Sequence, residues 1–155
     1  MVVSYMSQSP ILRMETDGVA AATLMDALLE RKVDVRLQVH GRSMWPVIPD
    51  GAILTIHPFH NNDLRVGNIL GYIRDRGDIR FHRVIRTRFR DGVVWLLMRG
   101  DAWASGGEWI PINTIVGTVS ICEYRGRHRK LNSGWRRLTG LWWNAGLYFI
   151  RRVCG

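Results

Sequence analysis

The sequence has few cysteines, few lysines and no long hydrophobic run near its start. Its two cysteines, Cys122 and Cys154, are too few for a disulfide framework. Residues 1–16 hold no sustained apolar segment, so we predict neither a secretory signal nor a transmembrane anchor at this end. The only lysines are Lys32 and Lys130, which leaves few positions that could supply a catalytic lysine.

The spacing of the histidines also argues against a metal site. Four of them show none of the Cys/His/Glu spacings typical of metal ligands, namely His40, His57, His60 and His128. We therefore expect no metal and no other cofactor.

Positive charge is present in excess and is unevenly distributed. The formal net charge is +9, with 22 basic and 13 acidic residues. Residues 125–155 contain eight basic residues and no acidic one, a charge of +8, whereas residues 1–124 contain the other 14 basic and all 13 acidic residues, a charge of +1. A basic tail on a nearly neutral domain suggests an anionic partner surface, either lipid or nucleic acid.

Alternating apolar and polar residues predict a mainly β protein. Residues 1–32 form an N-terminal tail with a helix from about Asp17 to Arg31, which we expect to pack on the sheet. Residues 33–124 form the β domain, and residues 125–155 a basic, tryptophan-rich tail. Short runs separated by Gly/Asp turns predict strands over 33–40, 52–56, 69–74, 79–88, 93–98 and 115–124.

The first candidate for chemistry lies between two predicted strands, in GRSMWPVIPDG at residues 41–51. A serine between Gly41 and Pro46 lies where the backbone must turn, because glycine permits close backbone approach and proline ends strand pairing. Such a turn can present the Ser43 oxygen to a ligand, and it can equally be an ordinary turn.

Two later blocks give the serine possible partners. His82 begins His-Arg-Val-Ile at residues 82–85, and Asp101 ends Arg-Gly-Asp at residues 99–101. Serine, histidine and aspartate, each at the edge of a predicted strand, follow an order that a nucleophile, a base and an orienting carboxylate can take.

Together, Gly-x-Ser-Met-x-Pro-x-Ile-x-x-Gly, His-Arg-Val-Ile and Arg-Gly-Asp resemble the type I signal peptidase family, within the signal peptidase/LexA-like clan of serine peptidases. The likeness is to its archaeal and endoplasmic-reticulum branch, which has histidine where bacterial leader peptidases have lysine. It covers about residues 35–121. It implies a signal-peptidase/LexA-like folded sheet or small barrel, and a serine endopeptidase that removes leader or signal segments after small residues.

In this interpretation Ser43 is the nucleophile and His82 the general base. Histidine suits the role because its unperturbed pKa, about 6.5, lets it take and return a proton near neutrality. In the family an aspartate stands beside the site and a second acid downstream orients the histidine. Here Asp101 is our first choice for the orienting acid, Glu108 is the alternative carboxylate, and a Ser/His dyad is also open.

The resemblance also implies how a polypeptide substrate would bind. In the family the strand before the serine pairs with the substrate backbone, as in other cases of strand addition. Leu37, Val39 and Met44 would then help line pockets for small apolar residues before the cut. The alternative is that each of the three belongs to the core.

The tail has the composition of a membrane-interface helix. The uncharged run 138–150 has 13 residues, about 20 Å as a helix, which is too short for a bilayer core of about 30 Å. Tryptophans with flanking arginines across 135–152 predict an amphipathic helix that lies on an anionic membrane surface or packs on the sheet. The aromatic positions disfavour nucleic acid. We therefore expect a peripheral, membrane-associated protein, with a cytoplasmic location also open.

Three functions are compatible with the sequence. The first is the signal-peptidase-type serine endopeptidase. The second is a LexA-like self-cleaving regulator, disfavoured because residues 1–32 are short for a helix-turn-helix unit and the lysine is missing. The third is a catalytically silent relative that binds peptides by strand addition.

Overall fold

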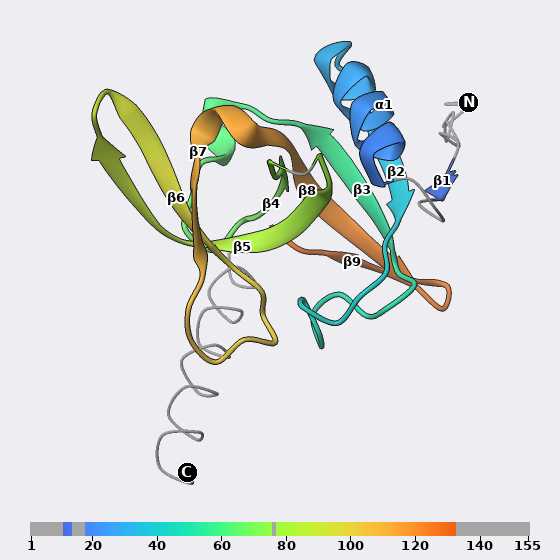
Figure 1. Cartoon of the computed structure of the whole chain (residues 1–155). Helices are drawn as coiled ribbons and strands as arrows, with labels where there is room; N and C mark the ends of the chain where they lie inside the picture. Colours follow the sequence, from blue (N-terminus) through green and yellow to red (C-terminus); the bar gives the residue numbers. More distant parts are fainter. Residues whose placement is uncertain (1–10, 14–17, 76, 133–155) are drawn as a thin grey trace, which may run out of the picture.

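The computed structural model describes residues 11–13, 18–75 and 77–132. Within these residues nine strands form one sheet and one α-helix packs against it (Figure 1). In chain order the elements are β1 (Ile11–Arg13), α1 (Gly18–Glu30), β2 (Val35–Gln38), β3 (Ile53–Pro58), β4 (Ile69–Ile73), β5 (Ile79–Arg90), β6 (Val93–Arg99), β7 (Glu108–Pro111), β8 (Ile115–Tyr124) and β9 (Arg127–Lys130).

The strands follow the order β1-β2-β3-β8-β4-β5-β6-β7, and β9 pairs with β8. The β1–β2 pair is parallel and the other pairs are antiparallel. Along this path β1 and β7 are the two ends, so the sheet of the described residues is open. The prediction of a mainly β fold with an N-terminal helix is confirmed, and an open sheet replaces the closed-barrel alternative. Strands β1 and β7 were not predicted.

The core lies between α1 and the first half of the sheet. Alternation along β2 and β3 directs Leu37, Leu54 and Ile56 inward, and α1 covers them with Met25 and Leu29. Burying each such side chain stabilises the fold by about 1.5–3 kcal/mol relative to exposure. This packing fixes β2, and therefore the loop that follows it, against the rest of the sheet.

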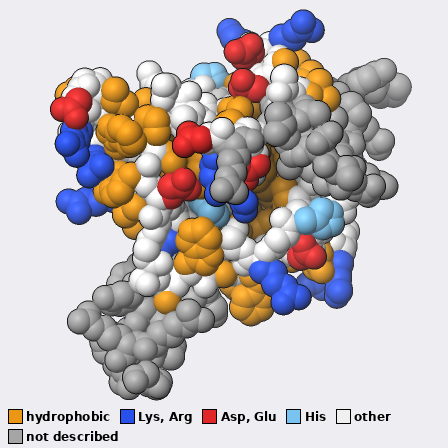
Figure 2. Space-filling view, in the orientation of Figure 1, with side chains coloured by type: hydrophobic (Ala, Val, Ile, Leu, Met, Phe, Trp, Pro, Cys, Tyr) orange, Lys and Arg blue, Asp and Glu red, His pale blue; other side chains and the backbone are white. Residues whose placement is uncertain are grey.

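The β5–β6 hairpin projects beyond the core. Asp91 and Gly92 both have positive φ, 51° and 77°, as a two-residue hairpin turn of type I′ requires. Near the turn Phe89 is 75% exposed. Figure 2 shows hydrophobic side chains of this hairpin flanked by basic ones, at the left of the molecule. The inner half of the hairpin, where His82 lies, is buried.

The chain after Tyr124 differs from the prediction where it is described. Residues 127–130 form an exposed strand paired with β8, so the β domain continues past the predicted boundary at 124 and the tail is not helical at its start. Backbone pairing with β8 makes this polar segment a strand, which its composition did not indicate. The predicted helix and membrane contact at 135–152 lie outside the described residues. Among the helices of the described segments, none has the length and apolar character needed to cross a membrane.

Candidate active site

Ser43 lies on the loop that joins β2 to β3. The base of the loop is closed where the Val39 N–H donates to the Ala52 carbonyl at 2.9 Å. Inside it the Gly41 N–H donates to Asp50 Oδ1 at 2.8 Å, and Gly41 has a φ of 119°, which a residue with a Cβ rarely adopts. The sequence features that suggested a sharp turn thus hold Ser43 just beyond the end of a strand.

His82 faces Ser43 from β5. Its Nε2 lies 3.2 Å from Ser43 Oγ, although the two residues are 39 positions apart. The His82 side chain is only 3% exposed, and the edge of its ring packs against Trp103, with centroids 4.8 Å apart. The predicted pair of nucleophile and base is therefore brought within hydrogen-bond reach.

The other nitrogen of His82 is held by a tyrosine. Tyr72 Oη on β4 lies 2.9 Å from His82 Nδ1, and it donates to Glu108 Oε2 at 3.2 Å. Tyr72 pairs with Arg80 in the β4–β5 ladder, so His82, two residues further on, is its diagonal neighbour on the same face. Sequence reasoning missed Tyr72. The hairpin register of β4 and β5 was the signal that could have found it.

Burial controls the protonation of His82 and Tyr72. It lowers the pKa of His82 to about 4, with the positive charges of Arg80 and Arg74 adding to the effect. Burial also raises the pKa of Tyr72 above its ordinary value, and the neighbouring Glu108 carboxylate raises it further. At neutral pH the imidazole is therefore neutral and able to accept a proton, and Tyr72 is an un-ionised hydroxyl.

Asp101 does not have the role that we predicted for it. Arg83 donates to both of its carboxylate oxygens, Nε to Oδ1 at 2.8 Å and Nη2 to Oδ2 at 2.6 Å. Both ring nitrogens of His82 already face Ser43 and Tyr72. Arg83, the neighbour of His82 on β5, thus binds the Asp101 carboxylate that we expected to contact His82. Glu108, the alternative acid, reaches His82 through Tyr72.

The β6–β7 connection that carries Asp101 also contacts the loop that holds Ser43. The Ala102 N–H donates to the Ser43 carbonyl at 2.9 Å, and the Asp101 N–H to Met44 Sδ at 3.4 Å. A Cβ on Gly100 would lie 2.4 Å from the Ser43 carbonyl oxygen, so only glycine fits there without displacing the loop. Arg-Gly-Asp therefore positions both halves of the site.

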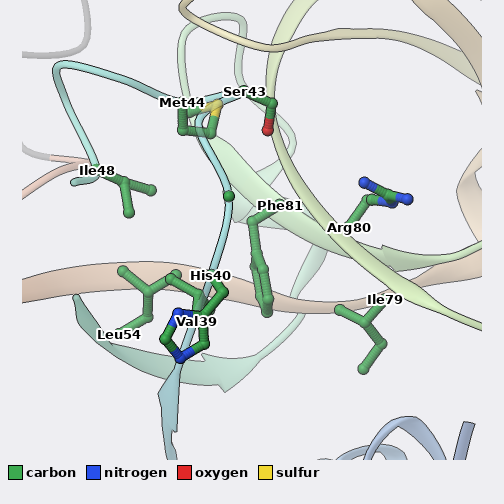
Figure 3. A pocket seen from close by; sticks show the side chains of 10 residues that line it. Val39, His40, Ser43, Met44, Ile48, Leu54, Ile79, Arg80 and Phe81 are labelled. Carbon is green, nitrogen blue, oxygen red and sulfur yellow. The ribbon is translucent and has the colours of Figure 1, made fainter. Parts of the chain in front are cut away.

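A pocket of about 160 Å³ opens beside Ser43. Figure 3 shows Ser43 and Met44 at one end of it, with Val39 and Leu54 toward the other. Two of the predicted substrate-binding residues, Val39 and Met44, line this pocket. Leu37 does not line it: its side chain is buried in the core cluster, so that part of the prediction is corrected. A cavity of about this volume holds a benzene-sized apolar group.

A second serine also contacts a histidine. Ser120 Oγ lies 2.7 Å from His57 Nε2, and His57 Nδ1 lies 2.6 Å from Asp34 Oδ1. This group lies on an open face, with the His57 and Asp34 side chains 41% and 49% exposed. Ser120 Oγ also lies 3.3 Å from the Thr55 carbonyl oxygen, a second acceptor for its hydroxyl proton, at the irregularity between β3 and β8. We assign this group a structural role.

Neither lysine is placed to act as a base at Ser43. Lys32 is exposed beyond the end of α1, and Lys130 is exposed on β9. In the part of the chain that is described, no group of three or more His, Cys, Asp or Glu residues could hold a metal ion. Neither a scan against models of protein families nor a search of curated proteins finds a match to this chain.

Proposed function

We propose that the chain is a serine endopeptidase of signal-peptidase type that cleaves leader or signal segments, with Ser43 as nucleophile and His82 as general base. The observation that carries the proposal is the 3.2 Å approach of Ser43 Oγ and His82 Nε2 beside an apolar pocket. The resemblance over residues 35–121 supplies the substrate class and the signal-peptidase/LexA-like fold. The pocket is suited to an apolar side chain before the cut.

The reaction follows from these positions. Ser43 Oγ attacks the peptide carbonyl carbon while its proton passes to His82 Nε2. The backbone N–H of Ser43 meets the developing oxyanion, a contact typically worth about 10²–10³ in rate. The imidazolium then protonates the leaving amine as the C–N bond breaks. Water, deprotonated by the same imidazole, hydrolyses the acyl ester and restores Ser43.

Labelling by a fluorophosphonate tests whether Ser43 is a nucleophile. We expect stoichiometric labelling of the unchanged chain and of Ser120→Ala, and none of Ser43→Ala, because Ser43 lies against a buried imidazole and a pocket, whereas the imidazole beside Ser120 is 41% exposed. Ser120→Ala is the matched control, since Ser120 also contacts a histidine. The labelled residue is identified by mass spectrometry of the digested protein. Labelling of Ser43→Ala at the level of the unchanged chain would contradict the proposal.

A leader-bearing peptide separates the peptidase from the peptide-binding alternative. If the chain is a peptidase, it should cut the peptide at a single bond, and no products should form with Ser43→Ala. Peptide binding without cleavage or labelling would indicate the catalytically silent relative. The LexA-like regulator is disfavoured further by the positions of Lys32 and Lys130.

The acid limb of the pH profile should lie unusually low for a histidine base. Burial lowers the pKa of His82 to about 4, and only the neutral imidazole accepts the Ser43 proton. The rate of labelling should therefore rise with pH through a midpoint near 4 and be level above it, instead of rising near the ordinary value of about 6.5. A midpoint at 6.5 would show that His82 is not the group that limits reactivity, or that it is not buried in solution.

A further inference from the structure

The buried Tyr72 hydroxyl lies between the base and a solvent-accessible carboxylate. Tyr72 is fully buried, whereas Glu108, the first residue of β7, is exposed. The hydroxyl is 2.9 Å from His82 Nδ1 and 3.2 Å from Glu108 Oε2. Three strands thus contribute one continuous chain of polar contacts, which ends at Ser43 on the far side of the imidazole.

The chemistry of the ends fixes the direction of the hydrogen bonds. An ionised carboxylate only accepts hydrogen bonds, so the Tyr72 O–H donates to Glu108. The Tyr72 oxygen then accepts from His82 Nδ1–H, and the His82 Nε2 lone pair is left facing the Ser43 hydroxyl. The partner of one ring nitrogen decides which tautomer is present. This order produces the tautomer that can act as a base.

We propose that Tyr72 and Glu108 are the positioning residues of the site, with Glu108 acting on His82 through the Tyr72 hydroxyl. This inference rests on the proposed function. Tyr72 holds the imidazole in the Nδ1–H tautomer, and Glu108 fixes the direction of the Tyr72 O–H bond. When His82 takes the Ser43 proton, the imidazolium keeps its Nδ1–H bond to Tyr72, whose dipole is oriented by the Glu108 charge.

The arrangement also avoids burying a carboxylate beside the base. An ionised carboxyl group is costly to bury unless it is paired and hydrogen-bonded. The one buried next to this site, Asp101, is neutralised by Arg83. Glu108 keeps its charge at the surface, and the neutral Tyr72 hydroxyl carries its influence inward. Tyr72 stays un-ionised because burial and Glu108 both raise its pKa.

The tautomer of His82 tests this inference without any substrate. The ring ¹⁵N chemical shifts of His82, assigned by their loss in His82→Gln, distinguish Nδ1–H from Nε2–H. We expect Nδ1–H in the unchanged chain and a change toward Nε2–H in Tyr72→Phe. Tyr124→Phe is the control, because Tyr124 is on β8 near the surface. An Nε2–H tautomer in the unchanged chain would overturn the proposal, and so would an Nδ1–H tautomer that persists in Tyr72→Phe.

Reactivity gives the second readout. In Tyr72→Phe we expect fluorophosphonate labelling to slow by about 10²-fold, because an imidazole in the wrong tautomer cannot act as a general base toward Ser43. In Glu108→Gln, a change at an exposed position that leaves the fold intact, we expect a loss of about 10-fold, typical of groups that orient another residue. Unchanged labelling in Glu108→Gln would remove Glu108 from the site even if Tyr72→Phe failed to fold.

The outcomes separate this inference from the proposed function. If His82 is in the Nδ1–H tautomer and changes in Tyr72→Phe, the positioning role stands even where no leader peptide is cut. If Ser43 is labelled and peptide is cut at the same rate in Tyr72→Phe as in the unchanged chain, the peptidase stands and the positioning role is wrong.

Discussion

A His82→Gln variant is expected to cleave a leader-bearing peptide about 10⁶-fold more slowly than the unchanged chain, as loss of the base alone does in serine peptidases. His82 is the group within 3.2 Å of the Ser43 hydroxyl, and the amide of glutamine cannot take its proton. Initial rates of product formation, followed by chromatography, measure the effect.

His57→Gln is the control for this variant, because His57 also contacts a serine but lies on an open face of the sheet. It should cleave at a rate close to that of the unchanged chain. Comparable rates for His82→Gln and the unchanged chain would contradict the assignment of the base. A large loss in His57→Gln alone would move the active site to Ser120.

Replacing Asp101 by alanine is expected to lower the free energy of unfolding by about 3–5 kcal/mol, because it leaves a buried charge without its partner. Arg83 is 1% exposed and Asp101 is 0% exposed, and two hydrogen bonds join them. Urea denaturation followed by circular dichroism measures the change.

Two further variants make this expectation specific. The double variant Arg83→Met with Asp101→Leu should recover much of the loss, since apolar residues of similar volume often replace a buried ion pair at little cost. Asp78→Ala breaks partly exposed pairs with Arg74 and Arg80 and should cost about 1 kcal/mol or less. A loss in Asp101→Ala as small as in Asp78→Ala would show that the buried pair is not as described.

The approach of Ser43 to His82 could be predicted because each residue lies in a local pattern. Ser43 is in a turn flanked by glycine and proline, and His82 lies in the predicted strand 79–88, after the turn at residues 75–78. The structure joins them through the order of the strands. The motifs around Ser43 and His82 were sufficient to predict this contact, since only the approach of two named residues had to be inferred.

The partner of His82 Nδ1 could not be chosen from the sequence, because it depends on strand register. Tyr72 lies in an apolar run and has the pattern of a core residue, and only its pairing with Arg80 brings it beside His82. Asp101 was attractive because it is an acid in the motif. Asp101 contacts Arg83, which is next to His82 in the sequence. No local pattern tells which of these two adjacent residues the Asp101 carboxylate contacts.

Short or polar strands were missed for a related reason. β7 has four residues that include a proline, and β9 is basic throughout. Neither has the alternation that marks a strand half-buried in a sheet. Each takes its conformation from a longer neighbour, β6 or β8. Leu37 lies in β2 and Val39 just beyond its end, and the cavity reaches Val39 but not Leu37.

Gly100 has no side chain and no reactive atom, yet the Ser43 carbonyl oxygen occupies the space where its Cβ would be. A survey of important positions that starts from chemical groups would therefore omit it, although the path of the β2–β3 loop past this point leaves no room for a side chain. In redesigning this scaffold, glycine at position 100 is therefore a fixed requirement of the backbone, independent of any reactive group.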